Sequence, residues 1–499
     1  MSVERNPWQA LGALCVGFFM ILLDMTIVAV ANPAIASHLQ ADMNSLVWVT
    51  SAYLLVYAVP LLVTGRLGDR FGPKNLYLAG LTVFTVASLW CGLAGSIGML
   101  IAARAVQGLG AALMAPQTMA VITRIFPADK RGAALGAWGS VAGVATLVGP
   151  LLGGVLVDRL GWEWIFIVNV PVGVVAFALA VRYVPTLPTT DRKFDVPGVL
   201  LSGVGMSLLV FGIQEGNTHD WSAMIWALIA AGIAVMAVFV VYQWRFAGSE
   251  PLVPLTLFKD RNFALSNVAI ASLGGAITGI MLPSYFYLQA VRDYSSTKSA
   301  LVFAPMAVVT GFLAPVVGKF IDRLHPRYLP TAGFAMFALS MFWMVNLTYA
   351  DSSILAIMGS SALMGLGSAC IWAPLAAVAT RNLPLHQAGA GSGIYNTTRQ
   401  VGSVLGSAAI GALLTARLSA NLPPGVGVKI TEGSSGGGHL PANLVDGFCS
   451  ALRESMWLPI GALVVSAVTT AFYVRNQPAP QASRPAPQAS EDAPVPAGA

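Results

Sequence analysis

The chain has 499 residues, of which 56% are hydrophobic and only 10% are charged, and its mean hydropathy is +0.73. Soluble globular domains carry roughly 25% charged residues, so no soluble core could bury this much apolar surface. The formal net charge of +6 includes no Lys/Arg-rich run of the kind that binds phosphates, which excludes nucleic acid as a partner.

The apolar runs predict an all-α integral membrane protein. A membrane-spanning helix needs about 20 apolar residues, and we expect fourteen such helices. The first six spans are expected at 10–31, 46–64, 75–94, 97–122, 132–157 and 160–182. Two more follow at 197–215 and 223–245, and the last six at 263–288, 300–318, 329–349, 354–379, 390–416 and 454–474.

The spans and the polar segments between them predict the domain organisation. The expected parts are a cytoplasmic N-terminus (1–9), an N-terminal six-helix bundle (10–182), a linker with two extra transmembrane helices (183–262), a C-terminal six-helix bundle (263–474) that includes an external loop (417–452), and a disordered cytoplasmic tail (475–499). The loop is rich in Gly, Pro and Ser and the tail in Pro, Ala and Ser, compositions that do not build a packed core.

Positive charges orient the bundle, because Lys and Arg collect in the loops on the cytoplasmic side. With the N-terminus placed inside, nineteen of the 27 Lys and Arg residues fall on the cytoplasmic side and six outside. Only Arg104 and Arg399 are left within spans. This asymmetry predicts an even number of spans, two cytoplasmic termini and a location in the inner (plasma) membrane.

An internal repeat relates the two six-helix halves. The loops Gly65–Lys74 and Gly318–Arg327 share a glycine, a base, Asp-Arg, a proline and a final base at one constant offset. A second constant offset matches Arg124, Pro127, Gly132, Gly136, Gly149 and Gly154 with Arg381, Pro384, Gly389, Gly393, Gly406 and Gly411. We therefore expect two parallel halves with the extra pair of helices between them.

Five motifs follow one another in order along the first half. They are Leu23-Asp24-Met25-Thr26 to Pro33, Gly65–Lys74, Arg104-Ala105-Val106-Gln107-Gly108, Gly149-Pro150-Leu151-Leu152-Gly153-Gly154, and Trp162-Glu163-Trp164-Ile165-Phe166 to Asn169-Val170-Pro171. With these motifs the chain resembles the major facilitator superfamily, and within it the fourteen-helix drug:proton antiporters. The resemblance implies a major facilitator fold, in which two six-helix bundles and two inserted helices export compounds by alternating access.

Asp24 is the one acid that lies well inside a predicted span. An ionised Asp at the centre of a membrane helix costs on the order of 2.5–3.5 kcal/mol, so it must be neutral, paired or hydrated. Each of these states lets a proton bind and leave. We predict that Asp24 couples transport to protons; the alternative is a fixed hydrogen bond or ion pair that only holds the first helix.

Arg104 is expected at the same depth as Asp24. Each lies about seven residues from the outer end of its span, or about 10 Å at 1.5 Å per residue. In the transporters that the chain resembles, helices 1 and 4 line the central cavity, so the two side chains are expected to approach each other. We predict that Arg104 tunes the protonation of Asp24; the alternative is an arginine that caps backbone carbonyls.

The resemblance also implies gating elements. The loop Gly65–Lys74 would latch the cytoplasmic side shut, and the Gly-Pro element of the fifth helix marks exporters rather than importers. The predicted gating residues are Gly65, Arg66, Asp69, Arg70, Asp322, Arg323, Gly149, Pro150, Gly153 and Gly154. The alternatives are a purely topogenic charge in the loop and ordinary small-residue packing in the fifth helix.

Substrate contacts are expected from aromatic and polar groups, because apolar walls with few convergent polar groups suit amphiphiles. The predicted substrate-binding residues are Tyr53, Tyr57, Gln107, Gln117, Tyr285, Tyr287, Trp372, Asn396 and Arg399. Each aromatic residue alone is equally explained by packing. Because the last six spans contain no embedded acid, neutral, monocationic or anionic amphiphiles are favoured over polyvalent cations.

The sequence predicts a proton-coupled antiporter that exports hydrophobic or amphiphilic small molecules. It has no ATP-binding P-loop, no paired nucleophile and base, and four cysteines without metal-ligand spacing, so we expect no enzyme activity, cofactor or metal. The expected partners are substrate, protons and the lipid bilayer, with a monomer as the functional unit. The alternatives are an uptake, lipid or metabolite transporter of the same fold and a non-transporting membrane sensor.

Overall fold

The structure is a computed structural model, and it describes most of the chain. The described residues are 6–41, 43–189, 195–216, 219, 221–245, 251–349, 351–384, 387–423 and 441–475. These parts are helices joined by short connections, and they contain no strand.

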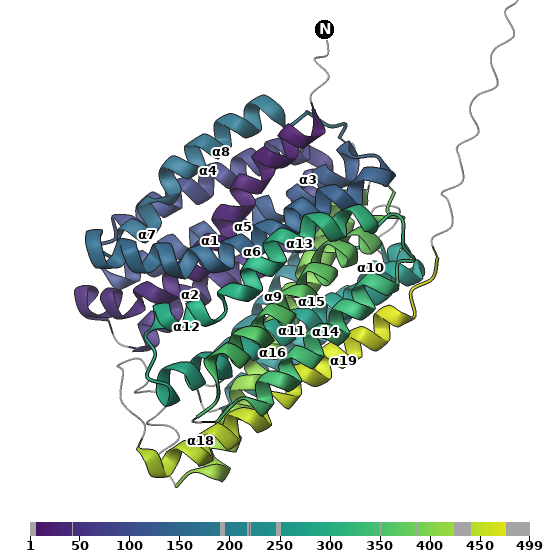
Figure 1. Cartoon of the computed structure of the whole chain (residues 1–499). Coiled ribbons are helices and arrows are strands. Elements are labelled where there is room, and N and C mark those ends of the chain that lie inside the picture. The colour runs from purple at the N-terminus through teal and green to yellow at the C-terminus, as the bar shows by residue number, and fades with distance from the viewer. Residues whose placement is uncertain are drawn as a thin grey trace, which may run out of the picture.

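The helices of the first half precede an inserted pair (Figure 1). The first half comprises α1 (Pro7–Leu39), α2 (Met43–Ala58), α3 (Leu61–Phe71), α4 (Pro73–Gly92), α5 (Ile97–Ile125), α6 (Ala128–Leu160), α7 (Trp164–Ile167) and α8 (Asn169–Tyr183). The inserted pair comprises α9 (Val196–Glu215) and α10 (Ala223–Arg245).

The second half follows the inserted pair. It comprises η1 (Leu255–Lys259), α11 (Arg261–Phe286), η2 (Tyr287–Val291), α12 (Ser296–Val302), α13 (Ala304–Phe320), α14 (Tyr328–Asn346), α15 (Ile354–Thr380), α16 (Ala388–Asn421), α18 (Ala442–Ser455) and α19 (Trp457–Ala471).

The chain is a multi-pass, all-α membrane protein, as predicted. Helices occupy all fourteen predicted ranges. Within the described residues, eleven helices are long and apolar enough to cross a membrane, or twelve if a bent pair counts as one span. α13, with 17 residues, is apolar but shorter. The number of fourteen membrane-spanning helices therefore stays a prediction.

The second predicted span, 46–64, is two helices rather than one. α2 ends before Val59, and its apolar stretch Trp48–Ala58 is bent by 47° from α3. Pro60 stands at the break, where its ring removes a backbone donor and disfavours a continuous helix. α3 packs against α16, so the break directs this part of the first half toward the second.

Helical structure extends into the predicted external loop 417–452 from both sides, in α16 and α18. α18 buries Phe448 and Leu452, which are four residues apart and therefore on one face. The prediction from the sequence missed this helix because the Gly- and Ser-rich composition of the segment obscured the amphipathic spacing. Residues 424–440 and 476–499, including nearly all of the predicted tail, lie outside the described residues.

The two most extensive helix contacts between the halves are those of α6 with α13 (Figure 1) and of α3 with α16. Glycines let these backbones approach closely. A Cβ atom on Gly65 would lie 2.5 Å from the carbonyl oxygen of Gly389, and one on Gly132 would lie 2.8 Å from that of Gly318. Real Cβ atoms do not come within 3.0 Å of another residue's heavy atoms. Both contacts therefore require glycine.

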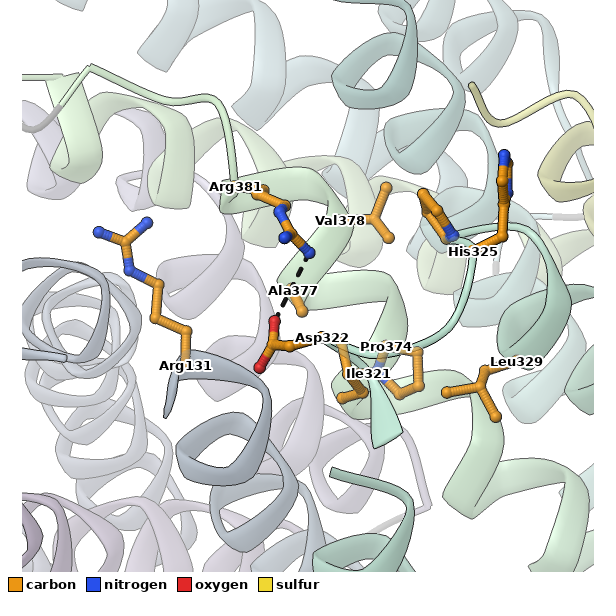
Figure 2. Close-up of a pocket in the computed structure, with 10 residues that line it drawn as sticks. Arg131, Ile321, Asp322, His325, Leu329, Pro374, Ala377, Val378 and Arg381 are labelled. Atoms are coloured by element: carbon orange, nitrogen blue, oxygen red, sulfur yellow. Dashed lines mark ion pairs between the residues drawn. The ribbon is translucent and has the colours of Figure 1, made fainter. Parts of the chain in front are cut away.

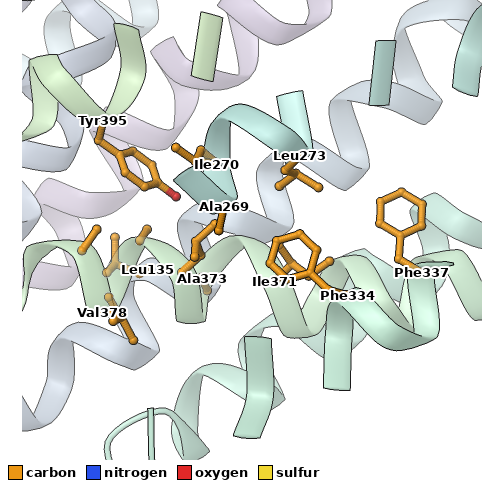
Figure 3. Packing of buried hydrophobic residues seen from close by; sticks show 14 of the residues in the cluster. Leu135, Ala269, Ile270, Leu273, Phe334, Phe337, Ile371, Ala373, Val378 and Tyr395 are labelled. Carbon is orange, nitrogen blue, oxygen red and sulfur yellow. The ribbon is translucent and has the colours of Figure 1, made fainter. Parts of the chain in front are cut away.

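The largest hydrophobic cluster also crosses between the halves (Figure 3). Phe334 of α14 lies beside Ile371 of α15, and Tyr395 of α16 lies beside Ile270 of α11. Leu135 of α6, from the first half, belongs to the same cluster. Interdigitated apolar side chains thus join the halves where the glycine contacts bring their backbones together.

Candidate functional site

A buried polar cluster surrounds Asp24 in the first half. The Asp24 side chain is 0% exposed and forms an ion pair with Arg104 of α5, whose Nη1 donates to Oδ2 at 2.6 Å. Gln107 Nε2 and Asn169 Nδ2 donate to Oδ1 at 2.9 and 3.2 Å. Three side chains from α5 and α8 therefore satisfy a carboxylate that would otherwise be costly to bury.

Arg104 is held as firmly as Asp24. Its Nε donates to the carbonyl oxygen of Val49 at 3.1 Å, and its Nη1 also donates to Gln107 Oε1 at 2.6 Å. The guanidinium carbon lies 4.2 Å from the centre of the Tyr53 ring and 5.6 Å from that of Phe166. Aromatic faces stabilise a cation in this way, so Arg104 is positioned from α2, α5 and α7 at once.

Ser88 of α4 forms the outer part of this cluster. Gln107 Nε2 donates to Ser88 Oγ at 2.6 Å, and Asn169 Nδ2 donates to it at 3.5 Å. Asn169 Oδ1 is buried and has no hydrogen-bond partner among the described residues. Sequence reasoning did not assign Ser88 or Asn169 to the site. Asn169 could have been recognised in the sequence, because it is an amide at the start of an apolar span. Ser88 could not, because single hydroxyls are common in membrane helices.

This arrangement has a direct chemical consequence. The ionised form of Asp24 is matched by one cation and two amide donors, whereas the protonated form would no longer hold Arg104 by charge. Adding or removing one proton therefore changes how strongly α1 is bound to α5.

A second group of predicted residues adjoins the cluster and reaches the other half. The rings of Tyr53 and Tyr57 are stacked, with centroids 6.0 Å apart and planes at 17°. Arg399 of α16 donates from Nη2 to Tyr57 Oη at 3.4 Å. Two tyrosines thus stand between the embedded cations Arg104 and Arg399, one in each half.

Other predicted substrate residues make internal contacts. Tyr287 is buried, and its hydroxyl donates to the carbonyl oxygen of Tyr349 at 2.7 Å. Gln117 Nε2 donates to the carbonyl oxygen of Thr64 at 2.8 Å, and Asn396 Nδ2 donates to that of Ser392 at 2.9 Å. These bonds stabilise helix packing and do not bring the three side chains to Asp24.

The other two aromatic residues predicted to contact substrate, Tyr285 and Trp372, pack within the second half, to which they belong. Tyr285 lies 5.8 Å from the Phe303 ring, and Trp372 packs, partly buried, against the largest hydrophobic cluster. Their predicted contact with substrate stays a prediction.

Two groups of ionic and hydrogen-bond contacts lie where the halves meet at one end of the bundle, which we call the latch end. In the first latch, Asp69 of α3 forms an ion pair with Arg124 Nη2 at 2.6 Å. Its carboxylate also accepts from the backbone N–H groups of Gly389 and Ala390, each at 3.0 Å. These groups begin α16 of the other half, and a helix N-terminus attracts negative charge. Asp69 therefore joins the halves.

The second latch has the same design with the roles of the two halves exchanged (Figure 2). Asp322 of the second half accepts from the backbone N–H of Gly132, near the start of α6, at 3.3 Å. It also forms an ion pair with Arg381 at 3.5 Å. Figure 2 shows Arg131 on the other side of the carboxylate. The residues of the two latches are those that the internal repeat matches, and both latches link one half to the N-terminal part of a helix in the other.

His325 lines the pocket beside the second latch. Partial burial lowers the pKa of the His325 ring, and the positive charges of Arg327 and Arg475 lower it further. Both effects disfavour a positive charge on this ring beside the second latch.

The start of α1 lies at the latch end, because the Trp8 ring contacts the Phe126 ring at 5.1 Å. The predicted gating residue Arg70 places its guanidinium 5.4 Å from the Phe71 ring, and Arg323 is exposed. Both lie beside the latches rather than within the contacts described above.

The glycines of the fifth predicted span have different surroundings. A Cβ atom on Gly149 would collide with Thr26 Oγ1, so α6 passes close to α1 two residues from Asp24. Gly153 is buried, whereas a Cβ atom on Gly154 would make an ordinary contact, 3.4 Å from Thr297 Oγ1. The side chain of Pro150 lies outside the described part of the structure.

A segment after the inserted pair, residues 251–257, crosses the first latch, and we call it the strap. Arg66 Nη2 donates to the carbonyl oxygen of Pro251 at 2.7 Å. Leu252 and Leu257 join a hydrophobic cluster with Leu62 of α3 and Ile394 of α16. The strap therefore packs on both halves where they meet, a role that no sequence motif indicated.

Asp195 ties the strap to the inserted pair. Its carboxylate accepts from Gln243 Nε2 at 2.6 Å and from Tyr242 Oη at 3.0 Å. It also accepts from the backbone N–H groups of Gly198 at 2.9 Å and of Leu252 at 3.1 Å. One partly buried carboxylate thus holds together the start of α9, the end of α10 and the strap.

The two latches are expected to differ in strength. Asp69 is 2% exposed and Asp322 17% exposed, and the ion pair of Asp69 is shorter. Loss of hydrogen bonds to a buried charge costs about 1.5–3 kcal/mol, so Asp69→Asn should shift the population toward an open latch end about 10- to 100-fold. A partly exposed pair contributes about 0.2–1 kcal/mol, so Asp322→Asn should shift it less than about fivefold.

The distance between spin labels at positions 71 and 382, now Phe71 and Asn382, measures whether the first latch is stronger than the second. Both positions are exposed, and they lie in different halves at the latch end. Longer distances should be populated in Asp69→Asn and rare in Asp322→Asn. A larger effect of Asp322→Asn would contradict the assigned strengths.

Comparison with known proteins adds to this geometry. The model of the family described as Major Facilitator Superfamily matches residues 14–407. An uncharacterized MFS-type transporter of Mycobacterium tuberculosis is 53% identical over 477 residues, which are 95% of this chain and 82% of that protein. The tetracenomycin C resistance and export protein of Streptomyces glaucescens is 33% identical over 461 residues, 89% of this chain and 85% of that protein.

Further relatives, 31–36% identical to the chain, are multidrug and antibiotic exporters. Among solved structures, that of the human organic anion transporter MFSD10 has a TM-score of 0.63, at 12% identity, over 92% of this chain and 100% of that chain. At this identity the likeness concerns the fold alone.

Proposed function

The chain belongs to the major facilitator superfamily, and from this premise we propose that it is a proton-coupled antiporter that exports hydrophobic or amphiphilic small molecules. The name of the Streptomyces relative, a resistance and export protein, supports export rather than uptake. The protein is a transporter and not an enzyme.

One observation carries the proton coupling, namely the buried ion pair between Asp24 and Arg104. A buried pair of this kind is weak evidence for stability alone, because desolvation offsets its attraction. It is a suitable proton carrier, because a proton on Asp24 releases Arg104 and a proton leaving Asp24 recovers it. In this proposal the proton enters from outside and drives release of the substrate.

The energy of one proton is sufficient for such export. Moving one charge across a membrane yields about 2.3 kcal/mol per 100 mV, which concentrates a substrate some tens of fold. Alternating access then requires that the ends of the bundle open in turn. We assign the two latches to the end that closes while the other end is open.

We place the latch end, with both termini, on the cytoplasmic side of the inner membrane. The nineteen positive charges predicted for that side support this orientation. The first latch contributes Arg124 to this set, and the second contributes Arg381. The monomer is the proposed functional unit, since each half supplies the partner that the other half's latch requires.

Everted membrane vesicles test the function. An imposed pH gradient, acid inside, should drive dyes into vesicles that contain the protein and release protons in exchange. Vesicles without the protein and vesicles treated with a protonophore are the controls. Accumulation that is independent of the gradient would contradict antiport, an uptake symporter would move dye in the opposite direction, and a sensor would move none.

A further inference from the structure

Arg399 is a cation embedded in the middle of the bundle. It lies eleven residues after the start of α16 at the latch end, or about 16 Å along the helix at 1.5 Å per residue. A bilayer core is about 30 Å thick, so this is close to its centre. An arginine at that depth costs on the order of 2.5–3.5 kcal/mol unless a partner compensates it.

The described residues do not supply a full partner for this charge. The one hydrogen bond described for the guanidinium is to Tyr57 Oη, and its 3.4 Å length is at the upper limit for such a bond. No ion pair of Arg399 with a carboxylate occurs in the described part of the chain. Asp24 is engaged by Arg104 and two amides. Most of the five N–H donors of Arg399 are therefore available.

The surroundings of Arg399 are aromatic. Tyr57 stacks on Tyr53, whose hydroxyl is buried and has no partner among the described residues. A Cβ atom on Gly274 of α11 would lie 2.5 Å from the Arg399 carbonyl oxygen, so the two helices touch there and fix the backbone that carries the charge. Arg399 is partly exposed, whereas Tyr53 and Tyr57 are each 1% exposed.

We propose that Arg399 and Tyr57 bind the anionic head group of the substrate, and that the exported compounds are amphiphiles with a single carboxylate or sulfonate. The planar guanidinium matches these groups with two parallel, charge-assisted N–H donors, and a neutral or cationic compound has no negative charge to complete that pairing. The stacked rings of Tyr53 and Tyr57 make the environment beside the guanidinium apolar, which suits a compound with a hydrocarbon part. This assignment rests on the proposed function and deepens it.

The assignment also fixes the charge moved in each cycle. Export of one anion in exchange for entry of one proton carries two positive charges inward. The membrane potential alone should therefore drive export, in addition to the pH gradient. A neutral substrate would carry one charge per cycle, and a monovalent cation would carry none.

Two dyes with the same ring system test the head-group preference. Anilinonaphthalene sulfonate carries one negative charge, and N-phenylnaphthylamine has the same rings without it. Purified wild-type protein should bind the sulfonate more tightly. Arg399→Gln should weaken saturable sulfonate binding about tenfold or more, the effect of losing a charged hydrogen bond, and leave binding of the neutral dye within about twofold. Arg399→Lys should restore part of the loss, and Tyr57→Phe should cause a smaller one.

The matched control is Arg417→Gln, which removes a charge from the same helix at an exposed ion pair with Glu454. It should leave binding of both dyes unchanged. Unaltered melting temperature and elution volume would show that each variant is folded. Equal loss of both dyes in folded Arg399→Gln, or no loss of either, would overturn the assignment.

Failure of this inference is distinct from failure of antiport. Binding is measured without a gradient, so selective loss of the sulfonate supports the head-group site even if vesicles show no proton exchange. Conversely, gradient-driven flux of the neutral dye with no sulfonate preference would leave antiport standing and reject the site.

Discussion

Replacement of Asp24 by Asn is expected to reduce gradient-driven export to the level of vesicles that lack the protein, a loss of some tens of fold in accumulation if the proton's full energy is withdrawn. Asn has nearly the shape of Asp and still accepts from Gln107 and Asn169. It cannot exchange a proton, so the step that releases and recovers Arg104 is removed.

The measurement is export of a panel of dyes by wild type and Asp24→Asn, with an imposed pH gradient. Equilibrium exchange of dye across the membrane, which needs no net proton movement, should persist in the variant and serves as its internal control. Equal gradient-driven export by the two proteins would sink the coupling assignment. Loss of exchange together with export would instead point to a purely structural role for Asp24.

Removal of Arg104 is expected to have the second largest effect. Arg104→Ala leaves the buried Asp24 carboxylate without its cation, and breaking a buried pair in this way costs about 3–5 kcal/mol. The loss of this cation should change the pH profile of transport, and the amount of folded protein should fall. Arg104→Lys keeps the charge but loses the contact with Val49, so its profile should lie between those of Arg104→Ala and wild type.

A double variant separates stability from coupling. Asp24→Asn combined with Arg104→Gln has no buried charge at the cluster, and it should recover most of the melting temperature that Arg104→Ala loses. It should not recover transport. Unchanged pH dependence of transport in both Arg104→Ala and Arg104→Lys would contradict the proposal that Arg104 tunes Asp24. A double variant no more stable than Arg104→Ala would show that the unpaired charge of Asp24 does not cause the loss of stability.

The sequence indicated one part of this site directly. Counting residues from the span ends placed Asp24 and Arg104 at one depth, and their side chains meet in the structure. The internal repeat likewise indicated that Asp69 and Asp322 are counterparts. Charges in an apolar helix are rare enough to stand out singly, and a repeat fixes their correspondence without any knowledge of the packing.

The partners of these residues could not be predicted in the same way. Gln107, predicted to contact substrate, also lies in the Asp24 cluster, and Tyr287, predicted for the same role, hydrogen-bonds within the second half. Helices that are apolar on all sides have no periodic face to show which polar groups converge. The backbone donors to Asp69 come from residues 320 and 321 positions away in the chain, a separation across which local patterns carry no information.

The strap connects the inserted pair of helices to the first latch, a connection that a transporter with only two six-helix halves would lack. α10 supplies Tyr242 and Gln243 to Asp195, and Asp195 in turn holds the backbone that accepts from Arg66 beside the first latch. Removing the inserted pair of helices and rejoining the chain ends should therefore weaken the contacts of the first latch as well as shorten the chain. The inserted pair thus supports the contacts beside the first latch through Asp195 and the strap.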